Sequence, residues 1–200
     1  MPAPDARLER DLAGFTDDVV YALGDVLVSI TVYGSAAGDD WIAGRSDVNT
    51  LIVVRAVSSA VLDVFAEIVP GWRRRRFALP LVVDEEFLER GRDVFPMELD
   101  DIRRAHRTLH GPDVVAGIEV DRAQLRRQCE HEARARLLRL RALFLDAGAR
   151  PGHLERLIAS SLVPFLVLLR HIVHLRGDDR PYAYADVLAA GDDWIAGRSD

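Results

Sequence analysis

The chain has 200 residues, of which 49% are hydrophobic, and this is enough for one ordinary globular domain or for two small ones. Its formal net charge of -6 and sequence pI near 5.5 argue against a general nucleic-acid coat or a polybasic membrane anchor, because both need a basic excess. A small molecule or a protein is therefore the expected partner.

The cysteine and lysine content narrows the chemistry further. The single cysteine, Cys129, cannot form an intrachain disulfide, and the absence of lysine excludes a P-loop and Schiff-base chemistry. The N-terminal residues lack the basic start and apolar core of a signal peptide. The longest apolar run, residues 157–169, contains two serines and a proline and is too short to span a bilayer. A soluble, cytoplasmic protein is the expectation.

The first half of the chain begins with a predicted helix and two predicted strands. Apolar residues recur at steps of three and four over the first twenty-odd residues, and this spacing predicts a helix that ends at Gly24. Residues 26–33 alternate and are rich in β-branched side chains, which predicts a strand that stops at Gly34 and Ser35. After a polar loop, residues 47–54 form a second predicted strand, whose apolar end is typical of a central position in a sheet.

Four more elements are predicted before residue 100. Residues 58–69 are predicted as a helix that Pro70 ends. Residues 78–83 read as a third strand, the next eight residues as a helical turn or short helix, and residues 94–99 as a fourth strand. The expected order is α-β-β-α-β-α-β, which indicates an α+β fold with a mixed β-sheet and flanking helices packed on one face.

From about residue 121 onward the pattern is helical only. One apolar stripe at helical spacing lies opposite arginines and glutamates, and it consists of Leu125, Cys129, Ala133, Leu137, Leu140 and Phe144. Residues 154–175 are apolar nearly all round, as in the central helix of a bundle, and Pro164 predicts a kink. Two domains are therefore expected, residues 1–118 with the sheet and residues 119–188 as an all-α helical domain.

The segment 189–200 repeats residues 36–47 letter for letter. The first copy lies between two predicted strands, whereas the second follows a predicted helix start. This favours a tail outside its native context over a true duplication. We expect residues 191–200 to contribute nothing to the functional site.

A Gly-Ser turn and a spaced aspartate carry the chemistry that the sequence suggests. Gly34 and Ser35 end one predicted strand, and Asp47 begins the next after a gap of eleven residues. Residues two apart on a strand point to the same face, so the side chains of Asp47 and Asn49 should project together. A small turn allows backbone N–H groups and a hydroxyl to approach phosphate groups closely. The pattern therefore predicts a phosphate site at this edge of the sheet.

This pattern resembles the signature of the nucleotidyltransferase superfamily, which includes DNA polymerase beta, the kanamycin and streptomycin adenylyltransferases and the minimal bacterial nucleotidyltransferases. In that family an apolar residue, Gly, and Gly or Ser are followed by a loop and then by Asp, an apolar residue, and Asp or Glu. The resemblance covers about residues 20–112. It departs at Asn49, where the second carboxylate belongs, and at Thr50, where an apolar residue is usual.

The resemblance implies a nucleoside triphosphate as substrate or ligand and Mg²⁺ as cofactor, held by Asp47, Asn49 and a third acidic residue on a neighbouring strand. Glu98 is the first choice for the third acid and Asp84 is the reserve. Glu98 also fits a surface strand residue or a helix cap, and Asp84 also fits an N-cap. An amide in place of a carboxylate removes a full negative charge, so Mg²⁺ affinity should be reduced.

Several basic residues are weaker candidates. By the same resemblance Gly34, Ser35 and Arg45 would contact the nucleotide, although Arg45 also fits a solvated loop. The run Arg73–Arg76 either binds phosphate or an acidic partner or forms a solvated face. Four histidines in spaced pairs, the first pair on a predicted helix after Glu98, are expected in the core or at an interface: His106 and His110, and His171 and His174.

The function implied by the resemblance is weak transfer of a nucleoside monophosphate to a hydroxyl of a small molecule or protein. One alternative is a catalytically inactive relative, a pseudoenzyme that binds a nucleotide or a partner protein. Another is a helical interaction module with the α/β part as scaffold. An intact carboxylate pair would favour catalysis, whereas Asn49 favours the alternatives. Neither a membrane nor a nucleic acid is the expected partner.

Overall fold

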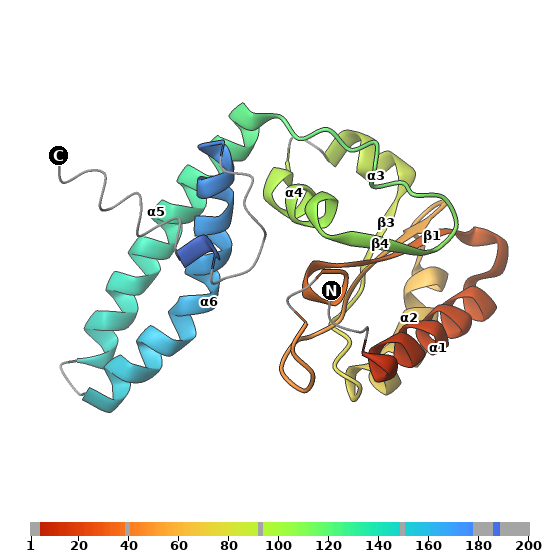
Figure 1. Cartoon of the computed structure of the whole chain (residues 1–200), viewed down its shortest axis with the longest axis horizontal. Coiled ribbons are helices and arrows are strands. Elements are labelled where there is room, and N and C mark those ends of the chain that lie inside the picture. Colours follow the sequence, from red (N-terminus) through yellow and green to blue (C-terminus); the bar gives the residue numbers. More distant parts are fainter. Residues whose placement is uncertain (1–4, 39–40, 92–93, 149–150, 178–185, 189–200) are drawn as a thin grey trace. The chain divides into compact units, whose positions relative to one another are not determined.

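The computed structural model describes residues 5–38, 41–91, 94–148, 151–177 and 186–188, and Figure 1 shows the chain. The chain divides into two compact units, Met1–Glu119 and Val120–Asp200. The repeated tail lies outside the described residues, so our expectation for it stays a prediction.

Helix α1 (Ala6–Leu23) is amphipathic, as its spacing predicts. Asp5 caps its N-terminus by accepting hydrogen bonds from the N–H groups of Arg7 and Leu8. Five apolar residues at steps of three and four along the helix are buried: Leu8, Leu12, Phe15, Val19 and Leu23. The helix ends at Gly24, whose φ of 49° is unfavourable for other residues.

The sheet has four strands in the order β3-β2-β1-β4. Strand β1 (Leu27–Tyr33) is antiparallel to both β2 (Asn49–Val54) and β4 (His106–His110), whereas β3 (Leu81–Asp84) is parallel to β2. The sheet is therefore mixed, and β1 and β2 are adjacent in it. The predicted α+β fold with a mixed sheet is confirmed.

Helices cover both faces of this sheet. Ile30, Val32 and Ile52 pack in the main core together with α1 and α2 (Ser59–Arg73). Leu51 and Val53 point the other way and are also fully buried, but they lie outside that core cluster. Figure 1 shows α4 (Pro96–Arg104) on the side of the sheet opposite α1 and α2. The prediction that helices pack on one face only is therefore wrong.

Helix α2 continues through Pro70, although the sequence pattern predicts that it ends there. Its last turn carries Trp72, which is 7% exposed. The Trp72 ring meets that of Phe15 edge-on at 5.6 Å, and the Phe15 ring stacks on that of Phe77 at 4.8 Å. Burial of these three rings outweighs the hydrogen bond that proline cannot donate.

Two further elements differ from the prediction. Residues 94–99 are not a strand, because α4 begins at Pro96, a residue well suited to the first turn of a helix. The fourth strand is instead β4, which carries His106 and His110. These two histidines were predicted to lie on a helix after Glu98, and that prediction is wrong. Its polar residues are tolerated because β4 lies at the edge of the sheet and pairs with β1 alone. The short helix α3 (Glu85–Arg90) is present as predicted.

The second unit contains two long helices, α5 (Arg122–Ala147) and α6 (Pro151–Leu175), as the sequence predicts for a helical C-terminal part. Only the beginning of the α5 stripe is buried: Leu125 is 1% exposed, whereas Leu137 is 43% and Phe144 is 53% exposed. Helix α6 runs through Pro164. The two helices could thus be predicted from the sequence, but how much of the apolar stripe on α5 is buried could not.

Helix α6 contains a segment, Gly152–Leu175, that is long and apolar enough to cross a membrane by length and composition, and 17% of its apolar window is buried. The apolar run 157–169 is too short to span a bilayer by itself. The segment Gly152–Leu175, which contains this run, is long and apolar enough to do so by length and composition.

Gly111 offers a direct test of the packing beside β4. Its φ is 74°, and a Cβ placed on it would collide with the backbone carbonyl oxygen of Val28. Gly111→Ala should therefore lower the free energy of unfolding by at least about 2 kcal/mol, since both backbone strain and a backbone clash oppose it. Urea unfolding followed by circular dichroism measures the change.

Gly117→Ala is the matched control, because no heavy atom lies within 4 Å of a Cβ at that position. It should change the free energy of unfolding by less than about 1 kcal/mol. Equal stability of the two variants would contradict the close approach of Gly111 to β1.

Candidate functional site

The turn that follows β1 is a short 3-10 segment, η2 (Gly34–Ala36). Gly34 has a φ of 74°, and its N–H donates a 2.8 Å hydrogen bond to the carbonyl oxygen of Ala105. That φ requires glycine for steric reasons. The turn is thereby fastened between β1 and the end of α4.

The structure brings Asn49 to this turn. Tyr33 and Asn49 are partners in the β1–β2 register, so the residue before the turn lies opposite the first residue of β2. A Cβ on Gly34 would lie 3.5 Å from Asn49 Nδ2, which is ordinary contact distance. Ser35 follows directly and is half-buried. Three predicted site residues, Gly34, Ser35 and Asn49, are therefore close together.

Asp47 precedes β2 and has a different environment. Val48, between the two motif residues, is buried, whereas the side chain of Asp47 is 60% exposed. One carboxylate oxygen of Asp47 forms a 3.0 Å ion pair with Nη2 of Arg76. Asp47 is thus engaged with a positive side chain from the segment that follows α2.

Arg76 is held by more than this ion pair. Its Nε donates to the carbonyl oxygen of Ser46 at 3.1 Å, and its Nη2 donates to the carbonyl oxygen of Arg45 at 2.6 Å. Arg76 is also the one non-glycine residue with a positive φ, 68°, in the described part of the chain. Such strain persists only where surrounding contacts maintain it.

Glu98 lies on α4 and is exposed, so the prediction that it belongs to a strand is wrong. It nevertheless faces the end of β1, together with Asp101. Burial raises the pKa of the Tyr33 phenol, and the negative charges of Asp101 and Glu98 raise it further. Asp101, missed in the sequence, lies three residues from Glu98, the spacing that puts two side chains on one helix face.

Asp84, the reserve third acid, lies away from the turn. It is the partner of Val54 in the β2–β3 register, at the opposite end of β2 from Asn49. Its Oδ1 accepts a 2.9 Å hydrogen bond from the N–H of Phe87 and so caps α3. This is the structural alternative considered for Asp84 from the sequence.

The residues beside the motif do not fit a pair of Mg²⁺ ions. The N–H of Val48 donates to the carbonyl oxygen of Arg76, and the N–H of Ala78 donates to that of Val48, both at 2.9 Å. The chain next to Asp47 and Asn49 thus supplies a guanidinium and a methyl group instead of a carboxylate. Magnesium needs oxygen ligands of high negative charge, and here the facing groups are an amide, a paired carboxylate and an arginine.

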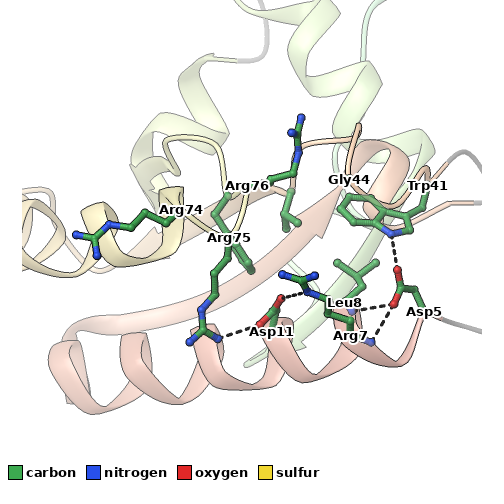
Figure 2. Close-up of a pocket in the computed structure, with 11 residues that line it drawn as sticks. Asp5, Arg7, Leu8, Asp11, Trp41, Gly44, Arg74, Arg75 and Arg76 are labelled. Atoms are coloured by element: carbon green, nitrogen blue, oxygen red, sulfur yellow. Dashed lines mark hydrogen bonds and ion pairs between the residues drawn. The ribbon is translucent and has the colours of Figure 1, made fainter.

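A cavity of about 210 Å³ lies on the α1 side of this region. It is lined by the first turns of α1, by Trp41, Gly44 and Val48, and by residues 74–77. Arg75 stacks over the ring of Trp72 at 4.8 Å and pairs with Asp11 at 2.9 Å, whereas Arg74 extends in another direction (Figure 2). Much of the basic run is therefore used within the protein.

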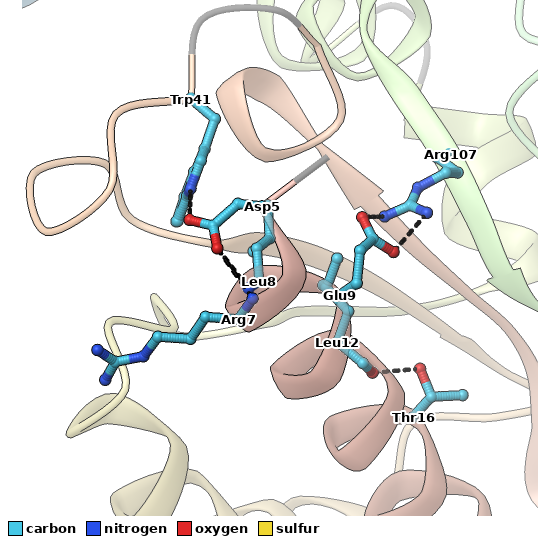
Figure 3. A network of polar contacts seen from close by, with 8 residues as sticks. All are labelled: Asp5, Arg7, Leu8, Glu9, Leu12, Thr16, Trp41 and Arg107. Carbon is cyan, nitrogen blue, oxygen red and sulfur yellow. Dashed lines mark hydrogen bonds and ion pairs between the residues drawn. The ribbon is translucent and has the colours of Figure 1, made fainter. Parts of the chain in front are cut away.

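Two polar contacts fix α1 beside the motif loop and β4 (Figure 3). Trp41 Nε1 donates to Asp5 Oδ2 at 3.1 Å, which ties the loop that leads to Asp47 to the N-cap of α1. Glu9 accepts two hydrogen bonds from the Arg107 guanidinium of β4 at 2.8 and 2.9 Å. These contacts tie the motif loop and β4 to α1.

His106 and His171, one from each histidine pair, lie in different environments. His106 contacts the carbonyl oxygen of Arg103 at 3.0 Å and the carboxylate of Asp113 at 3.3 Å. His171 is buried within the helical unit, as expected for a core histidine. Among the described residues, no group of three or more His, Cys, Asp or Glu side chains is placed to hold a metal ion.

Comparison with known proteins finds a likeness among solved structures. No protein-family model and no curated protein matches the chain. The solved structure of spectinomycin adenyltransferase AAD(9) from Enterococcus faecialis, with ATP and spectinomycin, is similar over 91% of this chain and 88% of that one, with a TM-score of 0.59. The chain has the fold of this adenyltransferase. The identity is 11%, so the likeness shows the adenyltransferase fold and no more.

The charge environment of Tyr33 tests the placement of α4 in this fold. Asp101→Asn should lower the pKa of Tyr33 toward its ordinary value of 10.0, because a negative neighbour that opposes the phenolate is removed. Burial still keeps the pKa of the variant above that value. Ultraviolet absorbance of tyrosinate against pH measures the transition, and Tyr33→Phe identifies which part of the signal belongs to this residue.

Glu86→Gln is the control, since Glu86 lies on α3 and pairs with Arg90. It should leave the Tyr33 transition in place. The same transition pH in both acid variants would show that α4 does not face the end of β1.

Proposed function

We propose that this protein binds a nucleoside triphosphate at the Gly34–Ser35 turn and transfers a nucleoside monophosphate to a hydroxyl only weakly. The observation that carries the proposal is the glycine turn at Gly34, close to the side chain of Asn49 at the strand ends of an adenyltransferase-type sheet. Glycine permits a close approach of phosphate to backbone N–H groups, and the hydroxyl of Ser35 adds a donor. Arg45, exposed in the adjoining loop, is the candidate for an outer phosphate contact.

Weak transfer follows from the charges around the turn. Phosphoryl transfer needs cationic groups that stabilise the charge on the transferred group and the leaving group, and in metal-dependent sites carboxylates hold those cations. Asn49 has no negative charge with which to hold a metal ion, and the carboxylate of Asp47 is already paired with Arg76. The turn is therefore better suited to binding phosphates than to assembling a catalytic metal centre.

The acceptor class that we propose is a small molecule with a hydroxyl group. The likeness extends over both units, and the similar adenyltransferase was solved with ATP and spectinomycin together. A second candidate is a catalytically inactive relative that binds a nucleotide or a partner protein. The Asp47–Arg76 ion pair favours it, because that pair competes with any metal at Asp47.

Calorimetry with ATP, GTP, CTP and UTP tests binding directly. At least one nucleotide should bind to the wild-type chain, and Ser35→Ala together with Gly34→Val should weaken that binding by about tenfold or more, because a hydroxyl is lost and the turn is strained. Absence of binding by all four nucleotides would exclude nucleotidyl transfer and nucleotide binding, and would leave only an inactive relative that binds a partner protein.

Asn49→Asp should tighten Mg²⁺ binding about three- to tenfold and increase transfer from radiolabelled ATP, because a carboxylate holds a divalent ion better than an amide. Asp47→Asn should have the opposite effect on Mg²⁺ binding. If neither substitution changes metal affinity or transfer, the motif is not a nucleotidyl-transfer site, and the inactive binding protein is the better description.

A further inference from the structure

The Arg76 guanidinium occupies a pocket of oxygen atoms next to the motif. Its contacts are with the Asp47 carboxylate at 3.0 Å and the carbonyl oxygens of Ser46 at 3.1 Å and Arg45 at 2.6 Å. A carboxylate and backbone carbonyls are also the oxygen types that bind hard cations. Here an organic cation that belongs to the chain uses them.

This placement does not depend on the ion pair alone. The side chains of Arg76 and Asp47 are 44% and 60% exposed, and exposed ion pairs contribute little by themselves. The two carbonyl contacts add to the ion pair in placing the guanidinium. The backbone of Arg76 is held as well, because its N–H donates to the carbonyl oxygen of Arg73 and its carbonyl accepts from Val48.

Arg76 and Asn49 both supply N–H donors at the start of the motif strand, Arg76 against Asp47 and Asn49 beside the Gly34 turn. A guanidinium has five N–H groups, and the contacts within the described residues use Nε and Nη2 but not Nη1. The amide of Asn49 adds two more N–H groups beside the Gly34 turn. Both side chains can therefore donate hydrogen bonds to phosphate oxygens, and arginine does so with a charge that does not titrate.

We infer that Arg76 is the resident cation of this site, and that phosphate groups of a nucleotide bind beside Asn49 without a divalent metal ion. The inference rests on the proposed nucleotide binding and adds that Arg76 replaces the metal. The departure of Asn49 from the family pattern then has a function, because an amide serves direct phosphate contact where a second carboxylate would repel it.

The test combines two titrations of the full chain. ATP is titrated by calorimetry in MgCl₂ and in EDTA, and Mn²⁺ is titrated by electron paramagnetic resonance without nucleotide. Wild-type affinity for ATP should be the same in the two buffers within about twofold. Arg76→Gln should weaken ATP binding in EDTA by about tenfold and tighten Mn²⁺ binding by about fivefold, because the oxygen atoms become available to a metal.

Arg74→Gln is the matched control, with the same charge change two residues away on an exposed side chain. It should behave as wild type in both titrations. Wild-type ATP binding that falls tenfold in EDTA, or equal behaviour of the two arginine variants, would overturn the inference. If ATP binds to no variant, the proposed function fails, and the Mn²⁺ titration still decides whether Arg76 holds the metal position.

Asp47→Asn provides a second variant if Arg76→Gln does not fold. It removes the anion that a metal needs but leaves Arg76 on the two carbonyl oxygens. ATP affinity in MgCl₂ should then stay within about twofold of wild type. A tenfold loss in MgCl₂ would show that Asp47, and with it a metal, is needed for nucleotide binding, and would overturn the inference.

Discussion

The antiparallel pairing of β1 with β2 is the constraint on which the site depends. Its register places Tyr33 opposite Asn49, so the Gly34 turn meets the start of the motif strand. The pairing is buried on both faces, by α1 and α2 on one side and by apolar residues outside that core on the other. A shift of one residue would turn Asn49 away from the turn and exchange the side chains that β2 presents to its two buried faces, so close packing on both faces keeps the site assembled.

The electrostatic character of the site comes from a second pairing, between Val48, just before β2, and Phe77 in the segment after α2. Parallel hydrogen bonds at Val48 bring Arg76 beside Asp47, and the aromatic packing of Trp72 and Phe77 fixes that segment against α1. A feature of the core thus determines which charge faces the motif. The chain has the adenyltransferase fold, and the carboxylate at the start of its motif is paired with an arginine.

Much of the fold could be predicted from local periodicity, but the polar partners could not. The stripe on α1 and the alternation of β1 are local signals, and both elements formed as expected. Residues 94–99 are mostly apolar and were predicted as a strand, yet Pro96 starts a helix there. The polar strand β4 forms where β1 offers it a partner. Gly34 and Asn49 were predictable as neighbours from the spacing of the motif. The approach of Arg76 to Asp47 joins distant segments, so no local pattern could show it.

The central claim is that Arg76, and not a divalent ion, faces the nucleotide at this turn. A crystal structure of the chain grown with ATP and MnCl₂, with anomalous scattering used to locate manganese, tests it most directly. We predict triphosphate density against Gly34 and Ser35, with the Arg76 guanidinium on Asp47 and no manganese bound to that carboxylate. Manganese held by Asp47 and Asn49, with Arg76 displaced, would contradict it.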